Sequence, residues 1–249
     1  MKNIQAITFD FWGTLYRSAR TNNSNRTLIV KNAIREAGLA DIPDEKVIEA
    51  IEEAWKRWVH VWENEHRTWG AAEWVDTMQA LLEFDLPGDI RPRVLQELEE
   101  VVLDGNTQPI AGVVEMIPEL AKQYRLGIIS DTGVTSGKTL NKLLEREGLL
   151  RFFKKLVYSD EINSSKPAAQ PFQAALSGLG VEPQQAVHVG DLRRTDVAGA
   201  NRMGMWSIRF TGYQDDERVE FGEANIVLAD YANMSDALAK LEVLAGQEG

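Results

Sequence analysis

The chain has 249 residues, no cysteine and a formal net charge of −11 at pH 7. The lack of cysteine excludes disulfides and thiolate metal sites, and the acidic balance without any Lys/Arg-rich run argues against a nucleic-acid partner. No apolar stretch approaches the ~18–20 residues that span a membrane, and the amino terminus shows no signal-peptide pattern, so we expect a soluble cytoplasmic protein with no membrane association.

The first apolar run, residues 4–9, predicts a buried strand that ends at a single carboxylate, Asp10. Gly13 and Thr14 then turn the chain sharply. A charged residue at the end of a buried strand is rarely there for packing, so Asp10 is the first candidate for chemistry. Trp12 occupies the position where a second carboxylate would be the natural partner for acid–base catalysis.

Residues 17–108 show helical patterns and no convincing strand, which predicts a helical insert after the first strand. The helical patterns cover 26–38, 44–66, 70–84 and 90–103. A polar stretch at 20–25 marks the start of the insert, and Pro109 and Gly112 mark the return to the main pattern.

Three tryptophans of this insert, Trp55, Trp58 and Trp62, recur at helical spacing. The spacing predicts an amphipathic helix that buries this face in the core of the insert. The alternative is an aromatic wall over a substrate, to which Trp69 and Trp74 would contribute.

The rest of the chain alternates apolar runs with helical patterns. The runs cover 125–130, 155–158, 186–190, 205–210 and 225–228, and the helical patterns cover 113–123, 134–148, 168–179, 194–203 and 232–245. This alternation predicts an α/β fold, with a Rossmann-like parallel sheet covered by helices on both faces. Ligand sites in such sheets lie beyond the carboxyl ends of the strands.

Reactive side chains follow three more of these predicted strands. Ser130 and Asp131 follow the second strand, Lys166 lies in the polar loop after the third, and Asp191 ends the fourth, with Asp196 shortly after it. Because the carboxyl ends of parallel strands share one edge, these groups and Asp10 should converge on a single crevice. His188, in the middle of the fourth strand, is interpreted as a core residue.

This order of residues resembles the haloacid dehalogenase-like hydrolase superfamily. Asp10 stands in its Asp-x-Asp-Gly-Thr signature, Ser130 and Lys166 match its second and third motifs, and Asp191 and Asp196 match its Gly-Asp-x-x-x-x-Asp motif. The resemblance covers the α/β core at 1–16 and 109–249, and the insert at 17–108 has the place and size of the family's all-helical cap.

The resemblance implies a role for each of these residues. Asp10 would be the nucleophile, forming an aspartyl-phosphate, and Lys166 would neutralise negative charge. Asp10, Asp191 and the backbone carbonyl of Trp12 would hold Mg²⁺, with Asp196 orienting the water shell of the metal. The remaining groups would contact the substrate's phosphoryl oxygens or their surroundings: Trp12, Gly13, Thr14, Ser130, Asp131 and Lys166.

Trp12 departs from the pattern of the family's phosphatases, in which a second Asp protonates the leaving alcohol and then activates water. An indole can do neither, so simple alkyl phosphates should be poor substrates. The favoured reading is a Mg²⁺-dependent phosphohydrolase acting on a small soluble, anionic substrate. Either the substrate has a good leaving group, such as an acyl or aryl phosphate, or His60, His66 or a cap carboxylate supplies the acid.

Three alternatives stay open. A 2-haloacid dehalogenase needs no proton donor, and such enzymes carry Tyr at the position of Trp12, but they lack the acidic pair that Asp191 and Asp196 form here. A phosphonate C–P hydrolase keeps Mg²⁺ and uses a cap lysine, for which Lys31, Lys46 and Lys56 are candidates. A catalytically weak protein that binds a metabolite or partner is the third. The intact acidic pair favours the phosphohydrolase.

Overall fold

The centre of the fold is a six-stranded parallel sheet, seen in a computed structural model that describes residues 3–17, 23–38 and 42–247. The strand order is β3-β2-β1-β4-β5-β6, which is the doubly wound order of a Rossmann-like sheet, the kind of sheet that the sequence predicts. In the central strand Ala6 pairs with Arg125 on one side and with Ala186 on the other. The strands are β1 (Ala6–Phe9), β2 (Arg125–Ser130), β3 (Phe153–Tyr158), β4 (Ala186–Gly190), β5 (Trp206–Phe210) and β6 (Ile226–Leu228).

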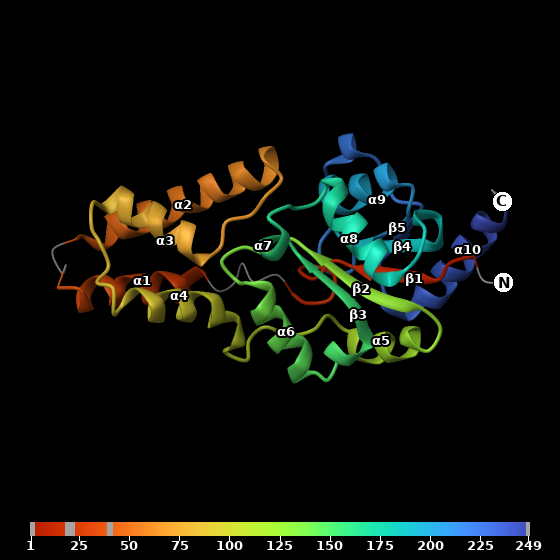
Figure 1. Cartoon of the computed structure of the whole chain (residues 1–249), viewed down its shortest axis with the longest axis horizontal. Coiled ribbons are helices and arrows are strands. Elements are labelled where there is room, and N and C mark those ends of the chain that lie inside the picture. The colour runs from red at the N-terminus through yellow and green to blue at the C-terminus, as the bar shows by residue number, and fades with distance from the viewer. Residues whose placement is uncertain (1–2, 18–22, 39–41, 248–249) are drawn as a thin grey trace.

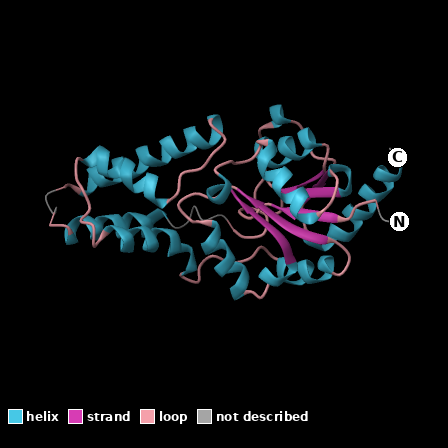
Figure 2. Cartoon of the chain, in the orientation of Figure 1, coloured by secondary structure: helices cyan, strands magenta, loops and turns pink. Residues whose placement is uncertain are grey.

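Helices cover both faces of the sheet, as Figures 1 and 2 show. Side chains alternate along each strand, so Ile7 and Phe9 of β1 join the apolar core on one face while Ala6 joins the core on the other. The first core is completed by α5 (Val113–Ala121), α6 (Gly137–Arg146) and α10 (Met234–Gln247), and the second by α8 (Ala169–Leu179) and α9 (Ala198–Met203).

The predicted insert between β1 and β2 is helical in the described residues, and it forms a second body at one end of the sheet (Figure 1). Its helices are α1 (Asn23–Glu36), α2 (Asp44–Asn64), α3 (Ala71–Leu82) and α4 (Arg91–Glu100). They enclose an apolar core of their own around Trp74, Val94 and Leu98. An antiparallel bridge between Tyr16 and Pro109 brings together the chain that leaves the core and the chain that returns to it. The bridge lies next to the predicted limits of the insert, 17 and 108, and these limits stay a prediction.

Two predicted helices differ from the observed ones. The pattern at 134–148 yields a shorter α6, because Ser136 is extended and Gly137, the first helical residue, lies so close to the Tyr158 ring that no side chain would fit. The pattern at 194–203 is α-helical only from Ala198, since residues Arg193–Val197 form a π-helical turn. Among the helices of the described ranges, none is long and apolar enough to cross a membrane.

Candidate active site

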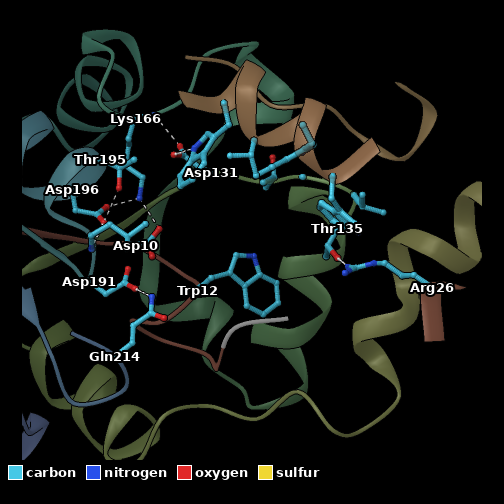
Figure 3. A pocket seen from close by; sticks show the side chains of 18 residues that line it. Asp10, Trp12, Arg26, Asp131, Thr135, Lys166, Asp191, Thr195, Asp196 and Gln214 are labelled. Atoms are coloured by element: carbon cyan, nitrogen blue, oxygen red, sulfur yellow. Dashed lines mark hydrogen bonds and ion pairs between the residues drawn. The ribbon is translucent and has the colours of Figure 1, made fainter. Parts of the chain in front are cut away.

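A pocket of about 400 Å³ lies where the strand order reverses, beyond the carboxyl ends of β1, β2 and β4. Asp10 directly follows β1, Asp131 follows β2 and Asp191 follows β4, so the sheet itself delivers three carboxylates to one place. Lys166 and Asp196 enter from the loops after β3 and β4 (Figure 3). The predicted convergence of strand ends is therefore present.

Lys166 connects two of these carboxylates. Its Nζ donates to Asp10 Oδ1 at 2.6 Å and to Asp196 Oδ1 at 2.6 Å, and the side chain is almost completely buried. Burial by itself would lower the pKa of Lys166, but the carboxylates of Asp10, Asp196 and Asp131 outweigh it and hold the pKa above its usual value. The ammonium is thus a fixed positive charge beside the predicted nucleophile.

Asp196 is fixed by its own turn as well as by Lys166. The π-helical geometry directs its carboxylate back to the Leu192 N–H, which donates at 3.0 Å, and the Thr195 hydroxyl donates at 3.1 Å. Burial would raise the pKa of Asp196, but Lys166 and His188 hold it below its usual value. A carboxylate held by so many protein donors has little freedom to move, and the expected role of orienting the water shell of a metal stays a prediction.

His188 confirms the expectation of a buried core residue and adds a contact that the sequence did not reveal. Its Nδ1 lies 2.9 Å from Thr8 Oγ1, and its Nε2 donates to Asp196 Oδ1 at 3.0 Å. Burial lowers its pKa, so the ring is neutral near pH 7. A neutral ring can donate from Nε2 only while Nδ1 is unprotonated, and this tautomer orients Asp196.

Asp10, Asp191 and Asp196 form the part of the site that could hold a metal. One oxygen from each lies within 4.8 Å of the others. Oδ1 of Asp191 is buried and has no hydrogen-bond partner among the described residues, while Oδ2 accepts from Gln214. Burial, with Asp10 and Asp196 nearby, raises the pKa of Asp191 well above its usual value, and burial raises that of Asp10 to about 7 against the opposing effect of Lys166. A hard divalent cation such as Mg²⁺ fits this oxygen set and would offset the repulsion.

Glycine is required at one position in each of the two acidic motifs, because an Asp side chain lies directly against the backbone there. Gly13 has a φ of +77°, and a Cβ there would overlap the carboxylate of Asp191. A Cβ at Gly190 would overlap the side chain of Asp196 in the same way. Both acidic groups therefore sit against bare backbone, which lets them approach Asp10 closely.

The other predicted contact residues are placed in different ways. The Ser130 hydroxyl is buried at the end of β2 with no hydrogen-bond partner in the described part of the chain, so it is free to donate. The Thr14 hydroxyl donates to Asp10 Oδ2 at 3.4 Å. Asp131 accepts from Trp62 Nε1 at 2.8 Å and from the Lys166 backbone N–H at 2.9 Å. Asp131 and the Trp12 side chain line the pocket, whereas Gly13, Thr14 and Ser130 lie behind its lining. The roles predicted for these residues stay predictions.

The prediction for the tryptophans of α2 is wrong for two of the three. Trp58 and Trp62 line the pocket and lie outside the apolar core of the insert, whereas Trp55 touches both. Trp74 is fully buried within the insert, away from the pocket lining. The alternative of an aromatic wall fits this face of α2, but Trp69 and Trp74, which that alternative also included, do not line the pocket. Periodicity identifies an apolar face, but it does not say which of two surroundings the face meets.

The pocket residues that the sequence analysis did not identify include Gln214 and Arg26. Gln214 follows β5, and its only signal was a position beyond the carboxyl end of a strand. Arg26 lies in the first turns of α1, in a helical pattern with no motif. Nothing in the sequence indicated that this end of α1 would reach the pocket.

Comparison with known proteins identifies the family and supports the fold. Residues 4–204 match the family model described as haloacid dehalogenase-like hydrolase. A glyceraldehyde 3-phosphate phosphatase from Methanopyrus kandleri is 32% identical over 86% of this chain and 88% of its own length. A phosphoglycolate phosphatase from Salmonella typhimurium is 25% identical over 96% of this chain and 94% of its own length.

Solved structures show the same fold. A putative hydrolase of this family from Bacillus subtilis, bound to magnesium, superposes with a TM-score of 0.66 at 17% identity, covering 94% of this chain and 98% of its own. A 2-haloacid dehalogenase from Pseudomonas syringae superposes with a TM-score of 0.67 at 23% identity, covering 95% and 99%. Similarity of fold therefore does not separate phosphate from halide chemistry, and the site must do so.

Proposed function

The chain belongs to the haloacid dehalogenase-like hydrolase family, and we propose that within this family it is a Mg²⁺-dependent phosphohydrolase acting through an aspartyl-phosphate on Asp10. The observation that carries the proposal is the cluster of Asp10, Asp191 and Asp196 around Lys166, in which Asp191 Oδ1 lacks a partner among the described residues. The two phosphatase relatives are named for small anionic phosphate esters, which supports a substrate of that kind.

The residues divide the reaction into two displacements. The Asp10 carboxylate attacks phosphorus, and the bond from phosphorus to the leaving oxygen breaks, with the electron pair going to the leaving group. Water then attacks the phosphorus of the aspartyl-phosphate, Asp10 departs as a carboxylate, and inorganic phosphate and a proton are released. Lys166 stabilises the charge on the attacking group, and the free Ser130 hydroxyl is available to a phosphoryl oxygen.

Asp10, Asp191 and the Trp12 carbonyl would hold Mg²⁺ at this site, with Asp196 behind them. When bound, the metal would supply electrostatic neutralisation of carboxylates and phosphate. The protein contributes the fixed position of the ligands, through Gly13, the Gln214 contact with Asp191 and the π-helical turn.

The insert supplies no replacement for the missing general acid in the described part of the pocket, and Asp131, the carboxyl group of the lining outside the metal cluster, accepts hydrogen bonds from Trp62 Nε1 and the Lys166 backbone N–H. Neither His60 nor His66 lines the pocket, and the insert contributes no carboxylate to its lining. We therefore infer that the leaving group departs without protonation, as an acyl or aryl phosphate allows. The insert contributes no lysine to the lining either, which leaves a Schiff-base C–P hydrolase without a described nucleophile.

A substrate panel tests the proposal. Purified protein is given acetyl phosphate, p-nitrophenyl phosphate, glyceraldehyde 3-phosphate, phosphoglycolate and 2-chloropropionate, each with Mg²⁺ and with chelator. We expect Mg²⁺-dependent phosphate release, fastest from the acyl and aryl phosphates, and none from the Asp10→Asn variant. Phosphate release that survives Asp10→Asn would refute the covalent mechanism, and chloride release that ignores the chelator would favour the dehalogenase instead.

A further inference from the structure

Arg26 places a buried positive charge at the far side of the pocket. Its side chain is only 4% exposed, one terminal nitrogen donates to Thr135 Oγ1 at 3.0 Å, and Nε has no acceptor among the described residues. Its guanidinium carbon lies 5.7 Å from the centre of the Trp55 ring. Burial lowers the pKa of Arg26 to about 10, so the group is charged at neutral pH. No carboxylate of the described residues forms an ion pair with Arg26; a buried charge without a counter-ion is costly, and an anion bound in the pocket would remove that cost.

The position of Arg26 separates it from the reacting groups. Figure 3 shows Arg26 and Thr135 on the opposite side of the pocket from Asp10, Asp191 and Lys166, with the indole of Trp12 between the two groups. In this arrangement an anion at Arg26 would be a second anionic group, separate from the phosphoryl group at Asp10.

The wall between the charged ends is mostly aromatic. Trp12 lines it from the core, and α2 contributes Trp55, Trp58 and Trp62. The ring centres of Trp58 and Trp62 are 5.6 Å apart, and their planes are tilted by 31°. The hydrogen bonds from Trp58 Nε1 to Trp69 O, at 3.0 Å, and from Trp62 Nε1 to Asp131 hold both rings in place. Fixed indole faces and edges favour a planar aromatic ligand.

We propose, on the basis of the phosphohydrolase function above, that the substrate is an aryl phosphate that carries a carboxylate on the ring. Its phosphoryl group lies at Asp10, its ring lies against the tryptophans, and its carboxylate pairs with Arg26. A pocket of about 400 Å³ has room for such a molecule, since ligand pockets begin at ~300 Å³.

This substrate also accounts for Trp12. When Asp10 attacks phosphorus, the phosphorus–oxygen bond breaks, and the electron pair stays on the aryl oxygen, which leaves as a phenolate and takes its proton from water. A phenol has a pKa of ~10, whereas water, a guide to alkyl alcohols, has ~15.7, so the phenolate leaves without a general acid. A nucleoside monophosphate would satisfy the aromatic wall, but it has no second anionic group for Arg26, and its phosphate is an alkyl ester that would need the acid that is missing.

Two substrates of matched size test the proposal. 4-Carboxyphenyl phosphate carries the charge, and 4-carbamoylphenyl phosphate replaces it with a neutral amide. With Mg²⁺ and the full-length protein, we expect kcat/KM to favour the carboxylate by about ten- to a hundredfold, the range for a hydrogen bond to a charged group. The measured quantity is the ratio of the two kcat/KM values, which cancels any general loss of activity in a variant.

Variants at Arg26 identify the residue that reads the charge. Arg26→Met should reduce the ratio to near one, and Arg26→Lys should restore part of it. Thr68→Val is the matched control, because it removes a different contact between insert and core, a 2.6 Å hydrogen bond to Ser159; neither residue lines the pocket, so the variant should keep the wild-type ratio. A cooperative thermal unfolding transition, measured for all three variants, shows that each one is folded.

The outcomes separate this inference from the function beneath it. Mg²⁺-dependent hydrolysis of acetyl phosphate without any carboxylate preference in the wild type overturns the substrate class alone. The substrate class is also overturned if the ratio of the two kcat/KM values is the same in the wild type and in Arg26→Met. Faster hydrolysis of phosphoglycolate than of 4-carboxyphenyl phosphate would overturn the aromatic part. Failure to hydrolyse any phosphate overturns the phosphohydrolase and this inference together.

Discussion

Replacing Trp12 by Asp should give this protein an activity that it lacks. Trp12 lines the pocket two residues after Asp10, and the described pocket-lining side chains of the insert include no acid that could protonate a leaving alcohol. A carboxyl group at position 12 would fill that role. We expect Trp12→Asp to hydrolyse an alkyl phosphate such as glycerol 3-phosphate faster than the wild type does.

The size of the gain follows from the surroundings of position 12. General acid–base assistance is worth ~10²–10⁴-fold when the acid has a pKa near the working pH. Burial already raises the pKa of Asp10 to about 7 in this pocket, and a new carboxyl beside Asp10 would also meet like charge, so it should keep its proton near neutral pH. Because the new side chain is not positioned by evolved contacts, the lower end, about 10²-fold, is the expected gain.

The assay compares Trp12→Asp with Trp12→Asn, which has almost the same shape and no proton to give. Both variants open the same space beside Phe11, the ring that Trp12 contacts edge-on at 4.9 Å. Phosphate release is measured with Mg²⁺ from glycerol 3-phosphate and from acetyl phosphate. The two variants should differ on the first substrate and agree on the second, whose leaving group needs no acid.

Equal rates of glycerol 3-phosphate hydrolysis by Trp12→Asp and Trp12→Asn would contradict this prediction. A wild type that already hydrolyses glycerol 3-phosphate as fast as acetyl phosphate would also contradict it. Either result would mean that another group supplies the proton, and the absence of an acidic side chain at position 12 would then say nothing about the leaving group.

Three further predictions concern the charged cluster. Lys166→Met leaves Asp10 and Asp196 buried without their shared cation, so the free energy of unfolding in urea with chelator should fall by about 3–5 kcal/mol, and Mg²⁺ should restore part of it. The folded-state pKa of Asp10 is raised from 3.8 to about 7, so the metal-free protein should lose stability as the pH rises from about 4 through 7. Because Mg²⁺ requires the ionised form of Asp10, the increase in Tm on adding Mg²⁺ should be larger at pH 8 than at pH 5.5. Gly13→Ala should weaken Mg²⁺ binding in calorimetry at least about tenfold, because its Cβ would displace the carboxylate of Asp191 from a backbone already at φ +77°; unchanged affinity would contradict the predicted metal site.

The residues of the reactive centre could be predicted because local sequence patterns indicate where the strands of the parallel sheet begin and end. Near-continuous apolar runs define the parallel strands, and a polar residue at the end of each run must point toward one edge. Asp10, Lys166 and Asp191 were located by that rule and by the family motifs, and the structure brings them into one pocket. Strand β3 begins at Phe153 rather than at 155. Phe153 packs into the core, but the two lysines that follow it interrupt the apolar pattern, so the sequence did not reveal the earlier start.

The pocket residues far from Asp10 could not be predicted from the sequence, and the reason is physical. Which face of α2 meets the pocket depends on the rotation of that helix against the core, and an apolar stripe of Trp55, Trp58 and Trp62 looks the same in either orientation. Arg26 and Gln214 act through tertiary placement alone, since neither belongs to a motif. Helix α1 brings Arg26 to the core loop at Thr135, a contact between residues far apart in the sequence.

The charges at the reacting end of the pocket argue against halide chemistry more strongly than the fold does. Asp10, Asp131, Asp191 and Asp196 face one ammonium, Lys166, within the described lining, and burial keeps Asp10 partly protonated near pH 7. Any nucleophilic role for Asp10 requires its ionised form, so a further cation is needed among these carboxylates. A phosphate ester carries oxygens on the reacting phosphorus that such a cation can share, whereas the reacting carbon of a 2-haloacid carries no oxygen of its own. The same acidic cluster that hinders dehalogenation is therefore useful to phosphoryl transfer.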